Sequence, residues 1–248
     1  KFTLLPFFFF LLSFASHAKA QNKPLKGLLV TGGGHHDYAT QKEILTKELA
    51  KRVPVKWDIL FEMDPRRMKG MLSNDDWAKG YDFIFYNFCF AREDDTKFID
   101  KIIAVHKGGV PLIAMHCAMH TYHPYIKGKP EDKNWNKMLG VVSLGHGPHV
   151  PYDVTIAEEQ KDHPVVQGLP PKWRTPKGEL YMVPKVMEGT TVLAHGDNGS
   201  VHKPLEPQPV SWVKEKDGYR VYATTMGHHN ETVESKEFLD MVANGISW

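Results

Sequence analysis

Apolar residues in the first half of the chain fall into short continuous runs, separated by amphipathic segments. The runs have the length of buried strands, whereas the segments between them repeat apolar residues three and four positions apart, as helices do. We expect strands at 25–31, 53–61, 81–88 and 110–115, and helices at 38–52 and 94–107. Strands that alternate with helices form a parallel sheet covered on both faces. The first half therefore predicts an α/β fold with a mostly parallel sheet.

The second half is less regular and adds β-hairpin elements. Strand candidates lie at 149–158, 190–194, 210–214 and 219–225, and 234–245 is an amphipathic helix. The turn at 216–218 joins the last two strands in a hairpin pattern. Polar residues 128–136 indicate a surface insertion. Together the two halves predict a single flavodoxin-like domain over residues 21–248.

Residues 1–20 have the parts of a secretory signal peptide. A basic start at Lys1 precedes an apolar run over 4–14 and small residues at Ala18 and Ala20. The apolar run is too short to span a bilayer as a helix. We expect cleavage after Ala20 and a periplasmic or secreted protein without membrane insertion.

The composition is that of a globular protein and changes the picture mainly through histidine. The chain has 248 residues, with 31 Lys and Arg, 29 Asp and Glu, 14 His and 2 Cys. A net charge of +2 gives no sign of a nucleic-acid partner. The triple glycine at 32–34 lacks the GxGxxG and GK[ST] patterns of nucleotide sites, so no nucleotide cofactor is expected.

Histidines collect where the predicted strands end. Ligands of an open parallel sheet bind outside the C-terminal ends of its strands. These ends carry His35, His36, His116, His120, His123, His228 and His229. Any one of them can have a structural role, such as capping a helix, but histidines scattered over a surface would not concentrate there. The group therefore predicts a functional site.

One chemistry for this group is a divalent metal such as zinc, which neutral imidazoles bind well. His116 and His120 are four residues apart and share a face if a helix begins there. His35 and His36 follow the first strand. No HExxH motif is present. These four histidines are the candidate metal ligands.

A second chemistry is nucleophilic catalysis by Cys117, which follows the fourth strand at a position where nucleophile elbows expose a side chain. Cys89 follows the third strand. If these strands are neighbours, the two sulfurs can instead form a disulfide, which an exported protein permits. Nucleophile and disulfide remain alternatives on the sequence alone.

A third chemistry is acid–base catalysis on a sugar, because histidine both accepts and donates protons near neutral pH. The candidate proton carriers are Asp37, His116, His120, Glu179 and His228. The candidate sugar-binding residues are His35, Tyr122, Tyr181 and His229.

Several short segments carry a further message when they are taken together. They are GHHD at 34–37, HCA at 116–118, HPVVQGL at 163–169, ELY at 179–181, PVSW at 209–212, RVYATTMGH at 220–228 and NGISW at 244–248. Their number and order resemble the ThuA-like, or trehalose-utilisation, family from about residue 25 to residue 248.

The resemblance implies a fold similar to class I glutamine amidotransferases and a role in handling disaccharides or their oxidised keto forms. His116, Glu179 and His228 match the family's pattern best, followed by Asp37, with His35 or His36 at the family's early histidine. An amidotransferase elbow reads G-[IV]-C-x-G, whereas residues 115–119 read MHCAM. Glutamine hydrolysis is therefore not expected.

We expect an exported carbohydrate-active enzyme that hydrolyses or isomerises a glycoside or keto-sugar derivative at the histidine-rich strand ends. Its partner is a sugar or sugar derivative. The alternative is a non-catalytic carbohydrate-binding protein on the same fold. Nothing in the pattern specifies the oligomeric state.

Overall fold

The computed structural model describes residues 23–122, 124, 126–199 and 203–248. The predicted signal peptide and His123 lie outside these residues. Within them, no helix combines the length and the apolar character that crossing a membrane requires.

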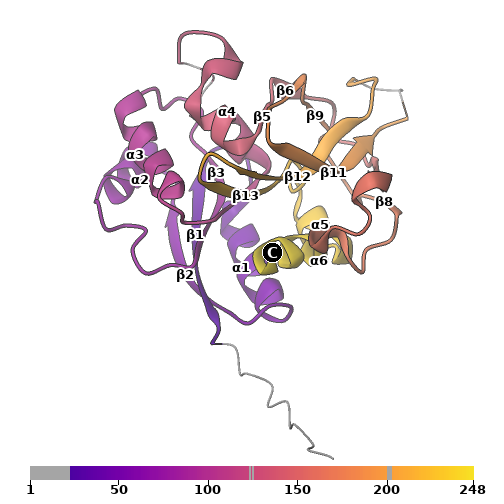
Figure 1. Cartoon of the computed structure of the whole chain (residues 1–248), viewed down its shortest axis with the longest axis horizontal. Coiled ribbons are helices and arrows are strands. Elements are labelled where there is room, and N and C mark those ends of the chain that lie inside the picture. The colour runs from indigo at the N-terminus through magenta and orange to yellow at the C-terminus, as the bar shows by residue number, and fades with distance from the viewer. Residues whose placement is uncertain (1–22, 123, 125, 200–202) are drawn as a thin grey trace, which may run out of the picture.

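A nine-stranded sheet forms the centre of the molecule, in the order β2-β1-β3-β4-β13-β12-β11-β7-β8 (Figure 1). Its strands are β1 (Leu25–Gly33), β2 (Val55–Glu62), β3 (Phe83–Cys89), β4 (Leu112–Met115), β7 (Asp153–Ile156), β8 (Lys172–Arg174), β11 (Thr190–Asp197), β12 (Gln208–Lys216) and β13 (Tyr219–Thr224). The first five strands in this order pair in parallel. This confirms the predicted flavodoxin-like core, whose strand order changes direction between β1 and β3.

The second half of the chain adds antiparallel strands to the same sheet. β13 pairs with β12 through the predicted turn, and β11, β7 and β8 continue outward. Two short ladders join β5 (Val141–Val142) to β10 (Lys185–Val186) and β6 (Gly145–His146) to β9 (Tyr181–Met182). The sheet is therefore parallel in one half and antiparallel in the other.

Helices cover both faces of the sheet (Figure 1). One face carries α1 (Tyr38–Ala50), α5 (Asn230–Val233) and α6 (Lys236–Ser247), and the other carries α2 (Pro65–Leu72), α3 (Thr96–Lys107) and α4 (Asn134–Leu139). Short 3₁₀ helices are η1 (His116–His120), η2 (Pro130–Asp132), η3 (Glu158–Gln160) and η4 (Pro164–Val166). In β1, Leu29 packs in the core under α1, whereas Leu28 and Val30 pack in the core under α3. This alternation buries the strand on both faces.

Two helices form where the sequence pattern does not predict them. Asp64 caps the start of α2, directly before Pro65 in the first helical position. The predicted surface insertion at 128–136 runs into α4, because the ring of Trp135 is buried and its indole N–H donates to the carbonyl of Ala118. Both helices are short, so their periodicity is too weak to stand out.

Candidate functional site

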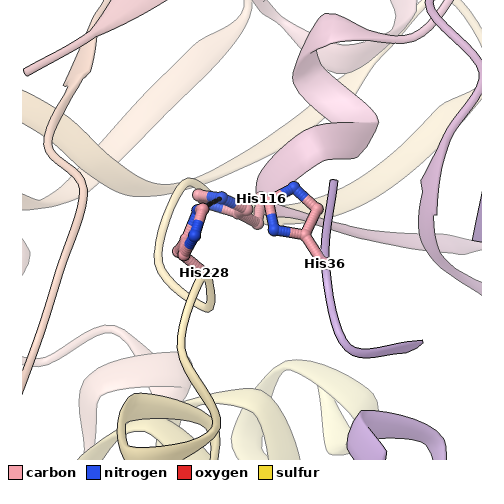
Figure 2. A group of neighbouring side chains, drawn as sticks. All are labelled: His36, His116 and His228. Atoms are coloured by element: carbon pink, nitrogen blue, oxygen red, sulfur yellow. Dashed lines mark hydrogen bonds between the residues drawn. The ribbon is translucent and has the colours of Figure 1, made fainter. Parts of the chain in front are cut away.

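Three chain segments bring histidines together at the C-terminal ends of the parallel strands. His36 follows β1, His116 opens η1 after β4, and His228 follows β13. Because β1, β3, β4 and β13 run parallel, their ends lie at one edge of the sheet. Figure 2 shows the three rings converging, with one ring nitrogen of His36 facing the other two.

Glycine allows the chain to turn sharply at two of these segments. At Gly33 φ is 88°, and an added Cβ would lie 2.2 Å from the carbonyl oxygen of Cys89. At Gly227 φ is 115°, and a Cβ would lie 2.3 Å from Cε of Met115. His116 itself has a φ of 48°, which residues with a Cβ rarely adopt. Unusual backbone conformations are thus concentrated at this edge of the sheet, as they often are at functional sites.

His116 is a buried imidazole with a fixed orientation. Its Nδ1–H donates to the carbonyl of Thr225 at 2.7 Å, and the hydroxyl of Tyr181 lies 3.1 Å from its Nε2. Burial lowers the pKa of His116, although Glu179 beside it acts in the opposite direction. The single proton of the neutral ring therefore sits on Nδ1, and the lone pair of Nε2 points into the cluster.

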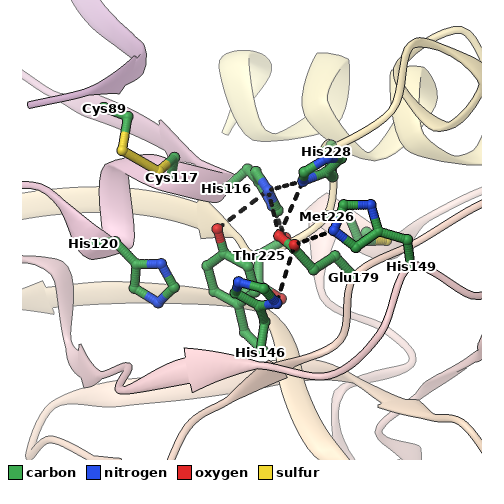
Figure 3. A network of polar contacts seen from close by, with 12 residues as sticks. Cys89, His116, Cys117, His120, His146, His149, Glu179, Thr225, Met226 and His228 are labelled. Atoms are coloured by element: carbon green, nitrogen blue, oxygen red, sulfur yellow. Dashed lines mark hydrogen bonds and ion pairs between the residues drawn. A yellow bond between two sulfur atoms is a disulfide. The ribbon is translucent and has the colours of Figure 1, made fainter. Parts of the chain in front are cut away.

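Glu179 is a buried carboxylate that four imidazoles surround (Figure 3). Its Oε2 lies 3.1 Å from His116 Nε2 and 3.0 Å from His228 Nδ1. Its Oε1 lies 3.0 Å from His146 Nδ1 and 2.9 Å from His149 Nε2. Burial raises the pKa of Glu179, but hydrogen bonds from His116 and His228, and the positive charge of these rings when they are protonated, outweigh burial and hold the pKa below its usual value. The cluster therefore contains a fixed negative charge.

Three atoms of this cluster form a small triangle. His116 Nε2 lies 3.3 Å from His228 Nδ1, and Glu179 Oε2 lies 3.1 and 3.0 Å from these two nitrogens. Ligand atoms placed about 2.0–2.1 Å from a tetrahedral metal ion are roughly 3.3 Å apart. When His116 is neutral, its Nε2 carries no proton, so the lone pair of Nε2 points at the negatively charged oxygen of Glu179 and the two repel. A cation held by these atoms would stabilise that arrangement.

His36 completes the group on its open side. Its ring centroid lies 4.7 Å from that of His116 and 4.6 Å from that of His228. Both of its ring nitrogens are buried and have no hydrogen-bond partner in the described part of the chain. Burial, with a contribution from the other two rings, lowers the pKa of His36 to about 2. One nitrogen from each of the three histidines lies within 4.8 Å of the others, a spacing suited to a shared metal ion.

A second trio with the same spacing consists of His149, His228 and His229. It shares His228 with the first trio, but the His149 side chain is 47% exposed. We therefore regard His36, His116 and His228 as the better-formed group.

An open pocket of about 450 Å³ leads to the cluster. Its lining residues are His35, His36, Asp37, His228, His229, Asn230 and Glu231. Nε2 of His229 is buried and has no hydrogen-bond partner among the described residues. Burial lowers the pKa of His229 to about 4, so its imidazole is neutral at physiological pH. A small molecule in this pocket would contact both candidate metal ligands and a neutral base.

Two buried amide side chains, one in α1 and one in β3, support the His228 loop. The Asn87 amide donates to the carbonyl of the Gln41 side chain, and Gln41 Nε2 donates to the backbone carbonyls of Gly227 and His228, each at 3.1 Å. Gln41 and Asn87 are almost fully buried. Sequence reasoning missed Gln41, because its partners lie near the opposite end of the chain.

Two predicted residues of the first strand end lie at the pocket without entering the cluster. Asp37 caps α1: its Oδ1 accepts the Thr40 backbone N–H, and its Oδ2 accepts the Asn230 amide. These hydrogen bonds, Asn230 first, lower the pKa of Asp37. His35 is exposed with a φ of 83° and belongs to neither metal-spaced trio of the described residues.

His120 and Tyr181 support the cluster from behind. His120 Nε2 lies 2.8 Å from Oγ of Ser143, and its ring stacks on Tyr181 with centroids 4.3 Å apart. His120 is therefore outside both metal-spaced trios of the described residues. Tyr181 is buried between His116 and His120, so its ring is not free to stack on a sugar as predicted.

Tyr122 requires a correction. The sequence places it at the site as a sugar-binding residue, but its ring is only 1% exposed. It packs against Phe88, Phe98 and Trp135 in the core under α3. A φ of 60° at Tyr122 turns the chain at this point, a feature that residue type does not reveal.

His146 and His149 contact Glu179 but were absent from the sequence prediction. Both come from the irregular second half, where pairing of β6 with β9 places His146 opposite Tyr181. The only sequence signal is the local GHGPH pattern at 145–149. The rule that places ligands at the ends of parallel strands does not reach such a loop.

The two cysteines are joined in a disulfide. Cys89 ends β3 and Cys117 lies in η1 after β4, and β3 and β4 pair directly. The sequence left open whether Cys117 is a nucleophile or part of a disulfide, and the structure shows the disulfide. It ties the backbone next to His116 to the neighbouring strand end (Figure 3). A sulfur in this bond is not available as a thiolate nucleophile.

Comparison with known proteins identifies the family to which the chain is similar. A family model described as "ThuA: Trehalose utilisation" matches residues 28–248. No curated protein matches the chain.

Solved structures of similar fold extend over most of the chain. A protein described as ThuA-like from Parabacteroides merdae ATCC 43184 is 19% identical, with a TM-score of 0.72 and coverage of 91% of this chain and 90% of that one. Another from Bacteroides uniformis ATCC 8492 is 18% identical, with a TM-score of 0.71 and 94% coverage of both chains. A protein described as part of a GMP synthase, from Thermoplasma acidophilum, is 13% identical, with a TM-score of 0.52 and coverage of 89% and 92%. The last likeness agrees with an amidotransferase-like fold.

Proposed function

The chain belongs to the ThuA family, which is linked to trehalose utilisation and carbohydrate metabolism, and from this we propose an exported, metal-dependent enzyme that acts on a keto-sugar or glycoside. The reaction takes place at the strand-end cluster of His36, His116, His228 and Glu179. The observation that carries this proposal is the triangle of His116 Nε2, His228 Nδ1 and Glu179 Oε2, with edges of 3.0 to 3.3 Å.

The three histidines are the proposed ligands of a divalent ion such as zinc. His116 has the features of a metal ligand, because its Nδ1–H is held by a backbone carbonyl and its unprotonated Nε2 faces His228, Glu179 and the Tyr181 hydroxyl. His36 supplies an imidazole whose buried nitrogens are not otherwise used in the described chain. Glu179 Oε2, at ligand spacing from His116 Nε2 and His228 Nδ1, is the proposed fourth ligand and supplies negative charge. His36 and His228 also line the open pocket, so a substrate can approach the ion from that side.

Isomerisation of a keto-sugar suits these groups better than direct hydrolysis of a glycoside. Hydrolysis of a glycoside needs a carboxylic acid to protonate the leaving oxygen. Both oxygens of Glu179 are in contact with imidazoles, and the Asp37 side chain is engaged in capping α1, so neither carboxylate is free for this role. Isomerisation needs a Lewis acid at the carbonyl oxygen and a base for the proton on the adjacent carbon. We assign this proton transfer to His229, which lines the pocket: its neutral ring takes the proton and returns it to the former carbonyl carbon, while the proton of the adjacent hydroxyl passes to the former carbonyl oxygen.

Export is part of the same proposal. It is supported by the signal-like residues 1–20 and by the Cys89–Cys117 disulfide, which suits an oxidising compartment. N-terminal sequencing of the protein from its native host should find Gln21 as the first residue. Cytoplasmic protein that retains the first twenty residues would contradict export.

The function is tested by measuring metal content and turnover on the same preparation, purified without a His tag. We expect about one divalent ion per chain by mass spectrometry. Chelation should abolish conversion of keto-sugars, detected by NMR in D₂O as deuterium uptake at the carbon beside the carbonyl, and zinc should restore it. The double variant His149→Ala/His229→Ala removes two members of the second histidine trio, including the proposed base His229. It should keep the ion but lose turnover, whereas His116→Ala should lose both.

Other results would point elsewhere. A folded wild-type protein that binds no divalent ion at micromolar concentration would contradict the metal site. A metal-loaded protein that binds sugars and converts none would instead favour a carbohydrate-binding protein.

A further inference from the structure

The nine-stranded sheet has two edges, and they differ in how they are protected. One edge is β8, which is three residues long and whose Lys172 and Arg174 both form ion pairs with Asp153. The other edge is β2, which is eight residues long, and no further strand of the described chain pairs with its outer side (Figure 1). Its pairing with β1 is continuous from Val55 to Glu62, without a bulge. A long, regular edge strand presents unpaired backbone N–H and C=O groups to which another strand can add.

The β2 edge also exposes apolar side chains. Ile59 is 43% exposed and Phe61 is 37% exposed, and Met63 directly after the strand is 47% exposed. Ile59 and Phe61 share one face of the sheet with Trp57, which packs against the core under α1. A row of apolar side chains beside unpaired backbone groups favours association with another protein chain.

The sequence of β2 is complementary to itself when two copies run antiparallel. A two-fold axis at Ile59 places Lys56 of one copy opposite Glu62 of the other, on the face away from α1. On the α1 face, the same axis places Trp57 of one copy opposite Phe61 of the other, and Ile59 opposite its own equivalent. Opposite charges and apolar side chains are therefore matched on the two faces of the joined strands.

Other registers of the same kind match less well. With the axis at Asp58, the two copies of this carboxylate face each other, and with the axis at Leu60, Asp58 faces Glu62. Like charges directly opposite each other destabilise a pair of strands. With the axis at residue 57, only residues 55–59 pair. The register centred on Ile59 therefore joins the most residues without placing like charges opposite each other.

The β8 edge lacks this complementarity. A two-fold axis at Trp173 would place Lys172 of one copy opposite Arg174 of the other, and these two positive charges repel. The strand is also too short to offer more than three residues for pairing. A second copy of the chain is therefore expected at β2 and not at β8.

We propose that two copies of this chain form a dimer by antiparallel pairing of their β2 strands, with the two-fold axis at Ile59. The two nine-stranded sheets then become one continuous sheet, and each copy covers the apolar edge of the other. The pocket that leads to the histidine cluster is lined by no residue of β2. The dimer is therefore independent of the function proposed for that cluster.

The dimer is tested by analytical ultracentrifugation of the purified protein. Ile59→Lys places two positive charges at the axis, and we expect the dissociation constant of the dimer to rise by more than about 100-fold. The matched control is Val186→Lys, which changes an aliphatic side chain of similar exposure, 39%, on β10. It should form dimers as the wild type does. Circular dichroism and thermal unfolding establish that both variants are folded.

Two charge-reversal variants test the register. Lys56→Glu and Glu62→Lys each place like charges opposite each other in their own dimers, so each should dimerise about tenfold more weakly than the wild type. When the two variants are mixed, a dimer of one with the other restores both pairs of opposite charges. We expect this mixed dimer to form in preference, detected by native mass spectrometry with one variant isotopically labelled. A misfolded variant would not form it.

Three results would overturn the proposal. The first is a wild-type protein that stays monomeric at the highest concentration at which it is soluble. The second is a dimer that Ile59→Lys leaves intact, because its interface would then lie elsewhere. The third is a mixture of the two charge-reversal variants that forms no preferred mixed dimer.

Discussion

Two regions of this molecule bury the ring nitrogens of a histidine, and they differ in what becomes of those nitrogens. His106 in α3 has Nε2 at 2.7 Å from the Tyr86 hydroxyl, and its Nδ1–H donates to the carbonyl of Val110. His36 at the strand ends has neither nitrogen paired within the described chain. Burial lowers both pKa values, to about 4 for His106 and about 2 for His36. His106 is fully buried, whereas His36 is part-buried and lies beside His116 and His228; burial lowers the pKa of both, and the clearest difference between the two histidines is hydrogen bonding.

This difference has an energetic meaning. A buried polar group without a partner costs about 1–3 kcal/mol. His106 avoids that cost through its two hydrogen bonds, so it is explained by stability alone. His36 does not avoid it, and a bound cation would recover the loss. The comparison teaches that unpaired nitrogens, rather than burial, mark the candidate functional histidine.

The largest expected effect is loss of metal on replacement of His116. His116→Ala removes the imidazole that the Thr225 carbonyl orients, and we expect affinity for Zn²⁺ to fall by more than about 100-fold. Equilibrium dialysis followed by mass spectrometry measures this directly. His106→Ala is the control and should bind the ion as the wild type does. If His116→Ala bound Zn²⁺ as tightly as the wild type does, the strand-end histidines would not be metal ligands and the two regions would not differ in function.

The next effect is on stability, and it belongs to the other region. His106→Ala leaves the Tyr86 hydroxyl and the Val110 carbonyl buried without their partner, so we expect a loss of about 2–5 kcal/mol in the free energy of unfolding. Urea unfolding of metal-free protein gives the value. His36→Ala should cost clearly less in the same assay, because no hydrogen bond to the described chain is broken. Equal losses in the two variants would refute the comparison.

A smaller effect is expected at Glu179. Glu179→Gln keeps the shape of the side chain but removes its negative charge from beside the ligands. We expect zinc affinity to fall by about 10–100-fold, because the amide oxygen can still take the ligand position but carries no charge. His149→Ala, which alters a half-exposed partner of the same carboxylate, should change affinity by only a few-fold. A Gln variant with unchanged affinity would show that the charge of Glu179 does not act on the ion.

The smallest effect, counted per pH unit, is a pH dependence of stability in metal-free protein. The pKa of His36 falls from 6.5 to about 2 on folding, so the unfolded chain takes up the proton first as the pH drops. The contribution of His36 to stability is therefore complete above pH 6.5 and is lost as the pH falls toward 2, by about 1.4 kcal/mol per pH unit. His106 adds a similar loss that stops near pH 4.

Urea unfolding between about pH 7.5 and 4 tests this slope. His36→Phe should reduce the slope of the unfolding free energy against pH by about 1.4 kcal/mol per pH unit below pH 6.5, which corresponds to one proton. His106→Phe should reduce the slope by the same amount, but only down to about pH 4. An unchanged slope in His36→Phe would mean that its ring is protonated in the folded protein.

The parallel half of the sheet and the position of the cluster were predictable from local pattern. Alternating strands and helices led to the correct fold class, and the strand-end rule named seven histidines that include His36, His116 and His228. Glu179 was a candidate proton carrier, and the family resemblance also pointed to it. His146 and His149 were missed because their loop reaches Glu179 only through pairing of β6 with β9. Tyr122 was misplaced because its backbone turns the ring into the core.

The sequence by itself determined where the strands end and that histidines gather there, because periodicity and glycine turns act over a few residues. Only the tertiary structure decided which ring nitrogens have partners. That depends on residues far apart: Thr225 beside His116, Gln41 beneath the His228 loop, and Tyr86 against His106. These contacts form only when β13 inserts next to β4 and the helices close over the sheet. For this reason the buried ring nitrogens of His106 have hydrogen-bond partners, whereas those of His36 have none in the described chain.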